Sequence, residues 1–164
     1  MVDDSGHQSD SQPPVTAVVI VDHGSRKSAS NDMLLKAVIS FAEQSEYAIV
    51  EPAHMELAEP DITSAFRRCV EQGAERVIVF PYFLSPGRHW SADIPRLVSQ
   101  AAQPFPGVTW LVTAPFGLHS GMSAIISDRI QYCLNVAEGT ANADSCDVCR
   151  ESGHCQIHRG GAAT

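Results

Sequence analysis

Four of the seven histidines follow short apolar runs that have the character of β-strands. These histidines are His23, His54, His89 and His119. If the runs are parallel strands, their carboxyl ends meet at one rim of a sheet, where ligands bind in folds of this kind. Neutral imidazole binds borderline divalent metals, and its pKa near neutrality suits proton transfer. The pattern therefore predicts a metal or proton-transfer site at that rim.

His23 and His89 are the stronger candidates, because each lies beside a glycine and an arginine in a sharp loop. Ordinary hydrogen bonding, a common role of histidine, explains the other two equally well. Glu56 lies in the loop after the second apolar run, where a carboxylate could bind a divalent cation or accept protons. Glu59 directly precedes a proline, so we expect it to complement the dipole of the next helix instead.

Positive charge gathers in the same two loops, although the net charge of the chain is −8. Arg26, Lys27 and Arg88 flank the two favoured histidines. With the amide groups at the start of the following helix, they predict a rim that binds anionic parts of a substrate. A solubility role explains Lys27 equally well. Ser25 is not surrounded by a G-x-S-x-G nucleophile elbow, so we expect a hydrogen-bonding turn residue at this rim.

A second group of potential ligands lies near the C-terminus. Cys146 and Cys149 have C-x-x-C spacing, Cys155 follows them, and Cys133 lies upstream in a helical pattern. Four thiolates suit zinc or an iron–sulfur cluster equally well by spacing. A tail with unconnected thiols is the alternative, since C-x-x-C also occurs in redox motifs. Thiolates of this kind require a reducing compartment.

Strands and helices must alternate strictly to position these residues. Apolar runs predict strands over 16–21, 47–50, 76–80 and 109–113. Amphipathic spacing predicts helices over 28–44, 60–73, 91–102 and 120–137. This order is typical of an α/β fold, here a single small, doubly wound, mainly parallel four-stranded sheet flanked by helices. Pairing of two copies would cover its open edges, so we expect a homodimer.

Length and composition allow one globular domain with a real core. We expect a disordered tail at 1–15, the domain at 16–137, and a flexible cysteine-containing extension at 138–164. The acidic balance disfavours a nucleic-acid-binding surface, and no apolar run approaches the roughly 20 residues of a membrane helix. The first 15 residues resemble neither a secretory signal nor a transit peptide. The expected compartment is the cytoplasm, or the plastid stroma if a transit peptide was removed.

Three stretches together resemble the class II tetrapyrrole chelatases, specifically the short sirohydrochlorin chelatases: VDHGSR, EPAHMELAEPDI and FPYFLSPGRHWSADIP. The resemblance covers about 18–134. It implies ATP-independent insertion of a divalent metal, Fe²⁺ or Co²⁺, into sirohydrochlorin, giving sirohaem when the metal is iron. It also implies that short forms pair as homodimers and that His23, His89 and Glu56 are the metal-binding and catalytic residues. Ser25, Arg26 and Arg88 would then hold the carboxylates of the substrate.

The cysteine-containing extension is similar to that of the plant-type sirohydrochlorin ferrochelatases. That similarity implies an iron–sulfur cluster whose ligands are Cys133, Cys146, Cys149 and Cys155. Three other functions stay open: a sirohydrochlorin cobaltochelatase serving cobalamin synthesis, a metal-binding module without catalysis, and a phosphate-ester hydrolase that uses His23 and Ser25.

Overall fold

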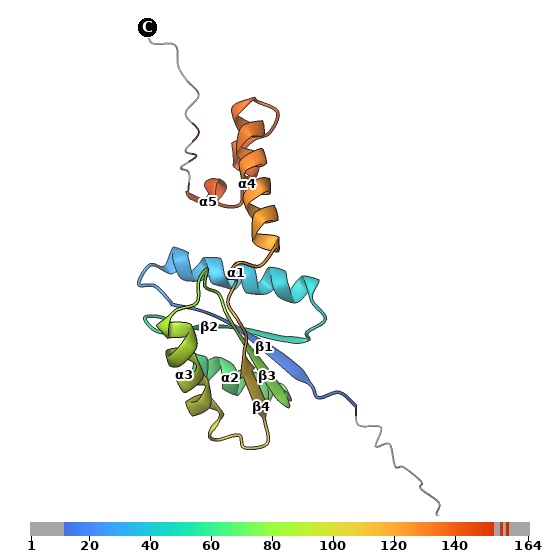
Figure 1. Cartoon of the computed structure of the whole chain (residues 1–164), viewed down its shortest axis with the longest axis vertical. Coiled ribbons are helices and arrows are strands. Elements are labelled where there is room, and N and C mark those ends of the chain that lie inside the picture. Colours follow the sequence, from blue (N-terminus) through green and yellow to red (C-terminus); the bar gives the residue numbers. More distant parts are fainter. Residues whose placement is uncertain (1–11, 153–154, 156, 158–164) are drawn as a thin grey trace, which may run out of the picture. The chain divides into compact units, whose positions relative to one another are not determined.

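The computed structural model describes residues 12–152, 155 and 157, and they form two compact units that divide between Gly117 and Leu118 (Figure 1). The first unit contains four strands and three α-helices: β1 (Thr16–Asp22), α1 (Ser28–Gln44), β2 (Ile49–His54), α2 (Ile62–Glu71), β3 (Arg76–Pro81), α3 (Ile94–Ala102) and β4 (Thr109–Val112). A π-helical turn at His89–Asp93 leads directly into α3. The predicted tail at 1–15 falls largely outside the described residues, and the predicted boundary at 137/138 stays a prediction.

All strands of the first unit are parallel, in the order β2-β1-β3-β4. Each connection between them contains a helix, as parallel pairing requires. The chain starts in the middle of the sheet, moves to one edge at β2, and then crosses to the other side of β1. This confirms the predicted α/β fold with a parallel four-stranded sheet.

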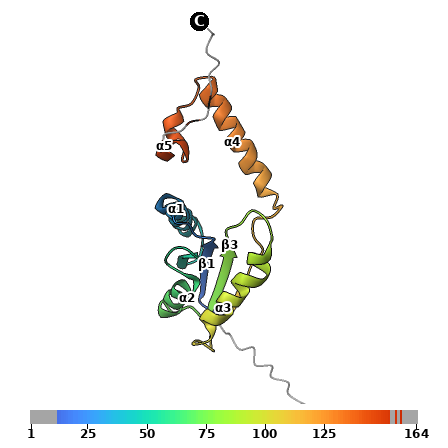
Figure 2. The same cartoon turned by 90° about the vertical axis from the view of Figure 1, so that its left-hand side faces the viewer.

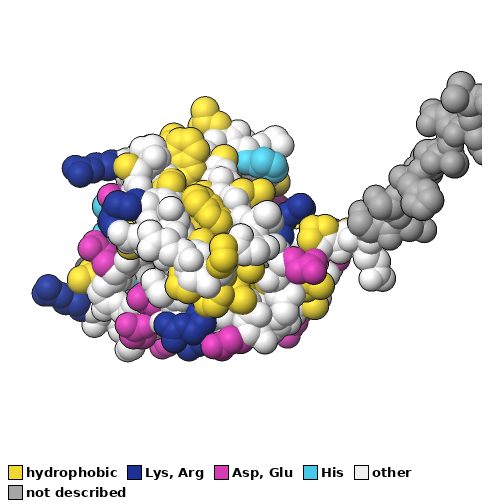
Figure 3. Space-filling model, turned by 90° about the horizontal axis from the view of Figure 1, so that it is seen from below, with side chains coloured by type: hydrophobic (Ala, Val, Ile, Leu, Met, Phe, Trp, Pro, Cys, Tyr) yellow, Lys and Arg dark blue, Asp and Glu magenta, His cyan; other side chains and the backbone are white. Residues whose placement is uncertain are grey.

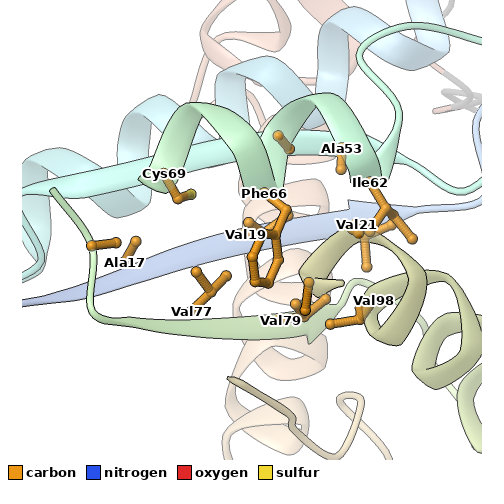
Figure 4. Close-up of a cluster of buried hydrophobic side chains, with 14 of the residues drawn as sticks. Ala17, Val19, Val21, Ala53, Ile62, Phe66, Cys69, Val77, Val79 and Val98 are labelled. Atoms are coloured by element: carbon orange, nitrogen blue, oxygen red, sulfur yellow. The ribbon is translucent and has the colours of Figure 1, made fainter. Parts of the chain in front are cut away.

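Alternation of apolar side chains along β1 explains why both faces of the sheet are covered. Residues at odd positions, such as Val19 and Val21, are fully buried against α2 and α3 (Figure 4). Residues at even positions, Val18 and Ile20, pack against Leu34 and Val38 of α1. A strand buried on both faces consists of continuous β-branched residues, as here. Figure 2 shows α1 and α3 on opposite sides of the strands.

The prediction for the second strand is wrong in its bounds. We expected 47–50, but β2 covers Ile49–His54 and continues through Pro52. Proline cannot donate a hydrogen bond to a sheet, which argues against a central strand. Because β2 lies at the edge of the sheet, Pro52 is tolerated there, in register with Ile20 of β1.

Two helix starts also differ from expectation. Helix α2 begins at Ile62 rather than at residue 60, because Asp61 is its N-cap and accepts a hydrogen bond from the Ser64 amide at 2.7 Å. Glu59 Oε2 accepts from the Asp61 amide at 3.0 Å, next to this helix start. The third helical segment starts at His89 instead of residue 91, so His89 lies in a helical turn and not in the preceding loop.

The second unit is built on the long helix α4 (Gly121–Ala137). A 3₁₀ turn at Ala143–Ser145 and the short α5 (Cys149–Ser152) follow. Helix α4 ends at a turn whose Gly139 has a φ of +79° and donates to the Val136 carbonyl at 3.1 Å. Within the part of the chain that the structure describes, no helix is long and apolar enough to cross a membrane.

Candidate metal centre

The pairing of β1 with β2 brings His23 and Glu56 side by side. The last paired residues of these strands are Asp22 and His54. Backbone hydrogen bonds continue beyond them, from the Met55 amide to the Asp22 carbonyl at 2.8 Å and from the Glu56 amide to the His23 carbonyl at 3.1 Å. As a result, Nε2 of His23 lies 2.7 Å from Oε1 of Glu56, and both side chains are about half exposed.

Gly24 permits this close approach of the two loops. Its φ is +82°, a left-handed conformation that L-residues with a side chain rarely adopt. A Cβ at this position would lie 1.9 Å from the Glu56 carbonyl oxygen, far inside van der Waals contact. The Gly24 amide donates to Oδ1 of Asp22 at 2.9 Å. The glycine of the DHGSR stretch is therefore required by the geometry of the site itself.

His89 approaches the same pair from the segment after β3. Its ring centroid lies 5.3 Å from that of His23, with the rings edge to face at 74°. Nδ1 of His89 lies 3.0 Å from Oδ2 of Asp93, four residues along the π-helical turn. When Nδ1 donates to this carboxylate, Nε2 carries the lone pair and is the nitrogen that binds a metal. Trp90 fixes the turn to the end of β4, because its Nε1 donates to the Thr113 carbonyl at 2.8 Å.

Two imidazoles and a carboxylate thus meet at the carboxyl ends of the strands, as the sequence predicted. Within 12–152, 155 and 157, no three His, Cys, Asp or Glu side chains are already arranged around one point as metal ligands. Nε2 of His23 faces Glu56 directly, so a cation at this place must replace that hydrogen bond. The donor set suits a divalent cation that binds and leaves, since the groups are half exposed and no thiolate is among them.

His54 and His119 have local partners. His54 is only 1% exposed, and its Nδ1 lies 2.6 Å from Oδ1 of Asp22. His119 belongs to the second unit, where its Nδ1 accepts a hydrogen bond from the Gly121 amide at 3.1 Å, at the start of α4. These contacts agree with hydrogen-bonding roles for both side chains.

Ser25 is held in a turn by Asn31, a residue that the sequence analysis missed. The Ser25 amide donates to Oδ1 of Asn31, and Nδ2 of Asn31 donates to the Ser25 carbonyl, each at 2.9 Å. Oγ of Ser25 accepts from the Lys27 amide at 3.1 Å. A polar amide in the first turn of an amphipathic helix was the available signal. Arg26 and Arg88 are exposed, as a rim that binds a substrate requires.

Two of the hollows in the first unit bear on the site. One, of about 270 Å³, adjoins the proposed site and is lined by Phe83, Leu84, Ser85, Pro86, Gly87, His89 and Trp90. The larger, of about 640 Å³, lies over the α1 face of the sheet and is lined mainly by apolar and aromatic side chains, including Val18, Phe41, Phe80 and Phe116. It contains neither favoured histidine, so this hollow and the ligand-rich rim do not coincide. On the face shown in Figure 3, Lys and Arg side chains are interspersed with Asp and Glu side chains.

Three of the four predicted cluster ligands adjoin one another in the second unit. The thiols of Cys146 and Cys155 raise the pKa of the Cys149 thiol to about 11, and Cys146 is the main cause. The Cys149 amide donates to Sγ of Cys146 at 3.4 Å, and the backbone amides of Cys149 and Val148 lower the pKa of the Cys146 thiol. Cys133 is exposed on α4. The donor chemistry of the three adjoining thiols fits an iron–sulfur or zinc group.

The family is shown by a match of residues 17–133 to the family model described as CbiX. The chain belongs to the CbiX family. The matched segment contains the first unit's strands and helices, except for the first residue of β1, and most of α4. The family resemblance stated from the three sequence stretches is confirmed.

Relatives of this CbiX-family chain include metal chelatases with different metals in their names. It is 52% identical over 141 residues to "Sirohydrochlorin ferrochelatase, chloroplastic" of Arabidopsis thaliana, which covers 86% of this chain and 62% of the relative. It is 45% identical over 82 residues to "Sirohydrochlorin cobaltochelatase" of Methanocaldococcus jannaschii, covering 50% of this chain and 57% of the relative. The chain therefore spans about three-fifths of the length of these relatives.

A solved structure has the same fold. The sirohydrochlorin chelatase SirB from Bacillus subtilis subspecies spizizenii, in complex with cobalt, superposes with a TM-score of 0.64 at 27% sequence identity. The match covers 71% of this chain and 50% of the SirB chain. The fold of the CbiX-family chain thus corresponds to about half of that protein.

Proposed function

We propose that this chain inserts ferrous iron into sirohydrochlorin, without ATP, to form sirohaem. The observation that carries the proposal is the meeting of His23, His89 and Glu56 at the carboxyl ends of the strands. The 52% identity to a chloroplastic sirohydrochlorin ferrochelatase supports iron as the metal and sirohydrochlorin as the acceptor.

Insertion exchanges one divalent cation for two pyrrole N–H protons, so the site must both deliver a metal and accept protons. The incoming Fe²⁺ replaces the hydrogen bond between Nε2 of His23 and Glu56 and is held by these groups with His89. As the macrocycle nitrogens take the cation, the freed imidazoles and carboxylate become available as bases for the two protons. Solvent then removes the protons, because the side chains are about half exposed.

The exposed rim beside these ligands suits a substrate with many carboxylates. Arg26, three residues after His23, and Arg88, directly before His89, are both exposed, and we assign them to carboxylate binding with Ser25. The hollow of about 270 Å³ next to His89 has apolar walls against which the edge of a macrocycle can pack.

The residue assignment is tested by anaerobic absorbance spectroscopy of sirohydrochlorin with Fe²⁺. We expect His23→Ala and His89→Ala each to slow insertion by about 100-fold or more, the usual effect of losing an acid–base group. His119→Ala is the matched control, since it removes a histidine that caps a helix, and we expect its rate to match wild type. Full activity of either site variant would refute the assignment.

Cobalt is the second candidate metal, because a CbiX-family relative is named a sirohydrochlorin cobaltochelatase. Imidazole and carboxylate donors do not separate Fe²⁺ from Co²⁺ strongly. The ratio of initial insertion rates with the two ions distinguishes the candidates. A faster reaction with Co²⁺ at equal free metal would replace the proposed ferrochelatase with a cobaltochelatase.

We also propose that Cys133, Cys146, Cys149 and Cys155 hold an iron–sulfur cluster. The interaction of the Cys149 thiol with those of Cys146 and Cys155 supports the cluster. Cys133 is exposed and is therefore accessible as a fourth ligand. When bound, such a cluster supplies one-electron redox chemistry. Visible absorbance of anaerobically purified protein tests this proposal, and we expect Cys149→Ser to lose the chromophore. A colourless wild type after reconstitution with iron and sulfide would refute it.

Homodimer formation completes the proposal. The fold matches half of a SirB chain. The hollow on the α1 face is apolar, so covering it with a second copy would bury apolar surface. Light scattering should give about twice the chain mass of 17.7 kDa, whereas a monomer at active concentrations would contradict the homodimer.

We place the protein in a reducing compartment, either cytoplasm or plastid stroma, and the name of the chloroplastic relative favours the stroma.

A further inference from the structure

We propose that Asp22 and His54 form a positioning pair that holds His23 against Glu56 and thereby sets the affinity of the site for a divalent cation. The inference rests on the proposed function, because it assigns a role to residues that do not themselves touch the cation. It gives His54 a role distinct from metal binding.

The pair is unusual in its burial. Among the residues that the structure describes, His54 is the one polar or charged side chain in the buried class, at 1% exposure. Its Nδ1 lies 2.6 Å from Oδ1 of Asp22, whose own side chain is 23% exposed. The His54 amide donates to the Pro60 carbonyl at 2.8 Å, so the backbone of His54 is also fixed from the segment before α2. The imidazole therefore has little freedom to move.

One oxygen of the Asp22 carboxylate contacts both His54 and the backbone next to His23. Oδ1 of Asp22 accepts from the Gly24 amide at 2.9 Å in addition to its contact with His54. Asp22 and Gly24 are the two neighbours of His23 in the chain. The backbone on either side of His23 is thus held by a carboxylate that is itself fixed by a buried imidazole, and Nδ1 of His23 lies 3.2 Å from the carbonyl of the same Gly24.

The position of Glu56 also depends on the contact between Asp22 and His54. His54 is two residues before Glu56, and the intervening Met55 amide donates to the Asp22 carbonyl. The contact between the Asp22 and His54 side chains therefore links the ends of β1 and β2 at the point where the loops to His23 and Glu56 begin. Loss of this link allows the loops to separate, which lengthens the distance between the two metal-binding groups.

The chemistry explains why a histidine is present at a buried position. An apolar side chain there would leave the Asp22 carboxylate with the Gly24 amide as its one protein donor within the described residues, and the link to β2 would be lost. Hydrogen bonds of a carboxylate to ring and backbone donors are directional and short. A polar pair thus fixes the register of two loops more closely than apolar packing does.

The experiment measures binding of Co²⁺ alone to the full chain without tetrapyrrole, by calorimetry and by the visible absorbance of the ion. It follows the component that His23→Ala removes, because the thiolates of the extension also bind Co²⁺. We expect His54→Leu, which removes the donor, to weaken Co²⁺ binding at least 10-fold. His54→Asn keeps an N–H donor near the place of Nδ1, and we expect it to restore affinity to within about threefold of wild type. Rescue by the shape-conserving polar variant is a result that a general packing role of His54 does not predict.

Two further variants separate positioning from loss of stability. Val77→Ala truncates a fully buried side chain of β3, and we expect it to lower stability while leaving Co²⁺ affinity unchanged. Asp22→Ala, which removes the acceptor of both contacts, tests the pair from the other side if His54→Leu does not fold, and we expect weaker Co²⁺ binding from it as well. In turnover assays, the KM for metal should rise while the KM for sirohydrochlorin stays constant.

The outcomes distinguish this inference from the proposed function. If wild type binds Co²⁺, His23→Ala removes binding at this site, and His54→Leu and Asp22→Ala bind as wild type does, then the metal site stands and the positioning pair is wrong. If wild type does not bind Co²⁺, or His23→Ala leaves binding unchanged, then the metal site and the pair both fail. Equal weakening by Val77→Ala and His54→Leu would also overturn the positioning role.

Discussion

Replacement of Gly24 by alanine should damage both stability and catalysis, by amounts that the structure allows us to work out. The φ of +82° costs an L-residue with a side chain about 1–2 kcal/mol. The added Cβ would lie 1.9 Å from the Glu56 carbonyl oxygen, whereas ordinary contact begins at 3.4 Å, so the two backbones must separate by about 1.5 Å. Overpacking of this kind costs roughly 1–3 kcal/mol more. A shift above 1 Å in a catalytic site lowers the rate by about 100-fold.

Gly73→Ala is a matched control for Gly24→Ala. Gly73 also has a left-handed φ, +95°, but a Cβ there meets nothing within 4 Å. We expect a loss of about 1–2 kcal/mol from this control, with activity unchanged. Urea unfolding followed by tryptophan fluorescence reports on the first unit, because both tryptophans, Trp90 and Trp110, lie in it. Equal stability of the two variants, together with full activity of Gly24→Ala, would refute this account of the close approach.

Three further predictions concern residues that are not proposed metal ligands. Asp61→Ala removes the N-cap of α2 that accepts from Ser64, and urea unfolding should show a loss of about 1 kcal/mol; no change would contradict the cap. Burial raises the pKa of Cys69 to about 12, above its unfolded value of 9.0, so its contribution is intact below pH 9 and lost as pH rises toward 12. Mass spectrometry after alkylation at pH 8 should find Cys69 unmodified in the folded chain. The hydrogen bond from Arg129 lowers the pKa of Asp147 to about 2, so this ion pair should persist at pH 4 and be lost as pH falls through 2. An NMR titration checks this pKa, and an unchanged value in Arg129→Gln would contradict the pairing.

Much of the fold was predictable because its signals are local. The β-branched run of β1 has the composition of a strand buried on both faces, and the helix over Ser28–Gln44 was predicted with its observed bounds. The second strand was misjudged because the tolerance for Pro52 depends on its place at the sheet edge. That place is a property of strand order, which no short stretch of sequence contains.

The candidate site was predictable in its members but not in its supporting contacts. Parallel strand ends gather side chains that follow each strand, which is why His23, Glu56 and His89 could be expected together. The contact of His54 with Asp22 could not be foreseen, because it depends on the register between β1 and β2. The same histidine spacing is compatible with a ligand and with a buried partner.

The central claim is that this CbiX-family chain catalyses metal insertion and does not merely bind metal. The most direct measurement is the amount of sirohaem formed per chain when anaerobic protein is given an excess of sirohydrochlorin and Fe²⁺. We predict many sirohaem molecules per chain, at a rate well above the spontaneous reaction, with the acceleration lost in His23→Ala. Binding of metal without acceleration over the spontaneous reaction would contradict the claim and identify a metal-binding module.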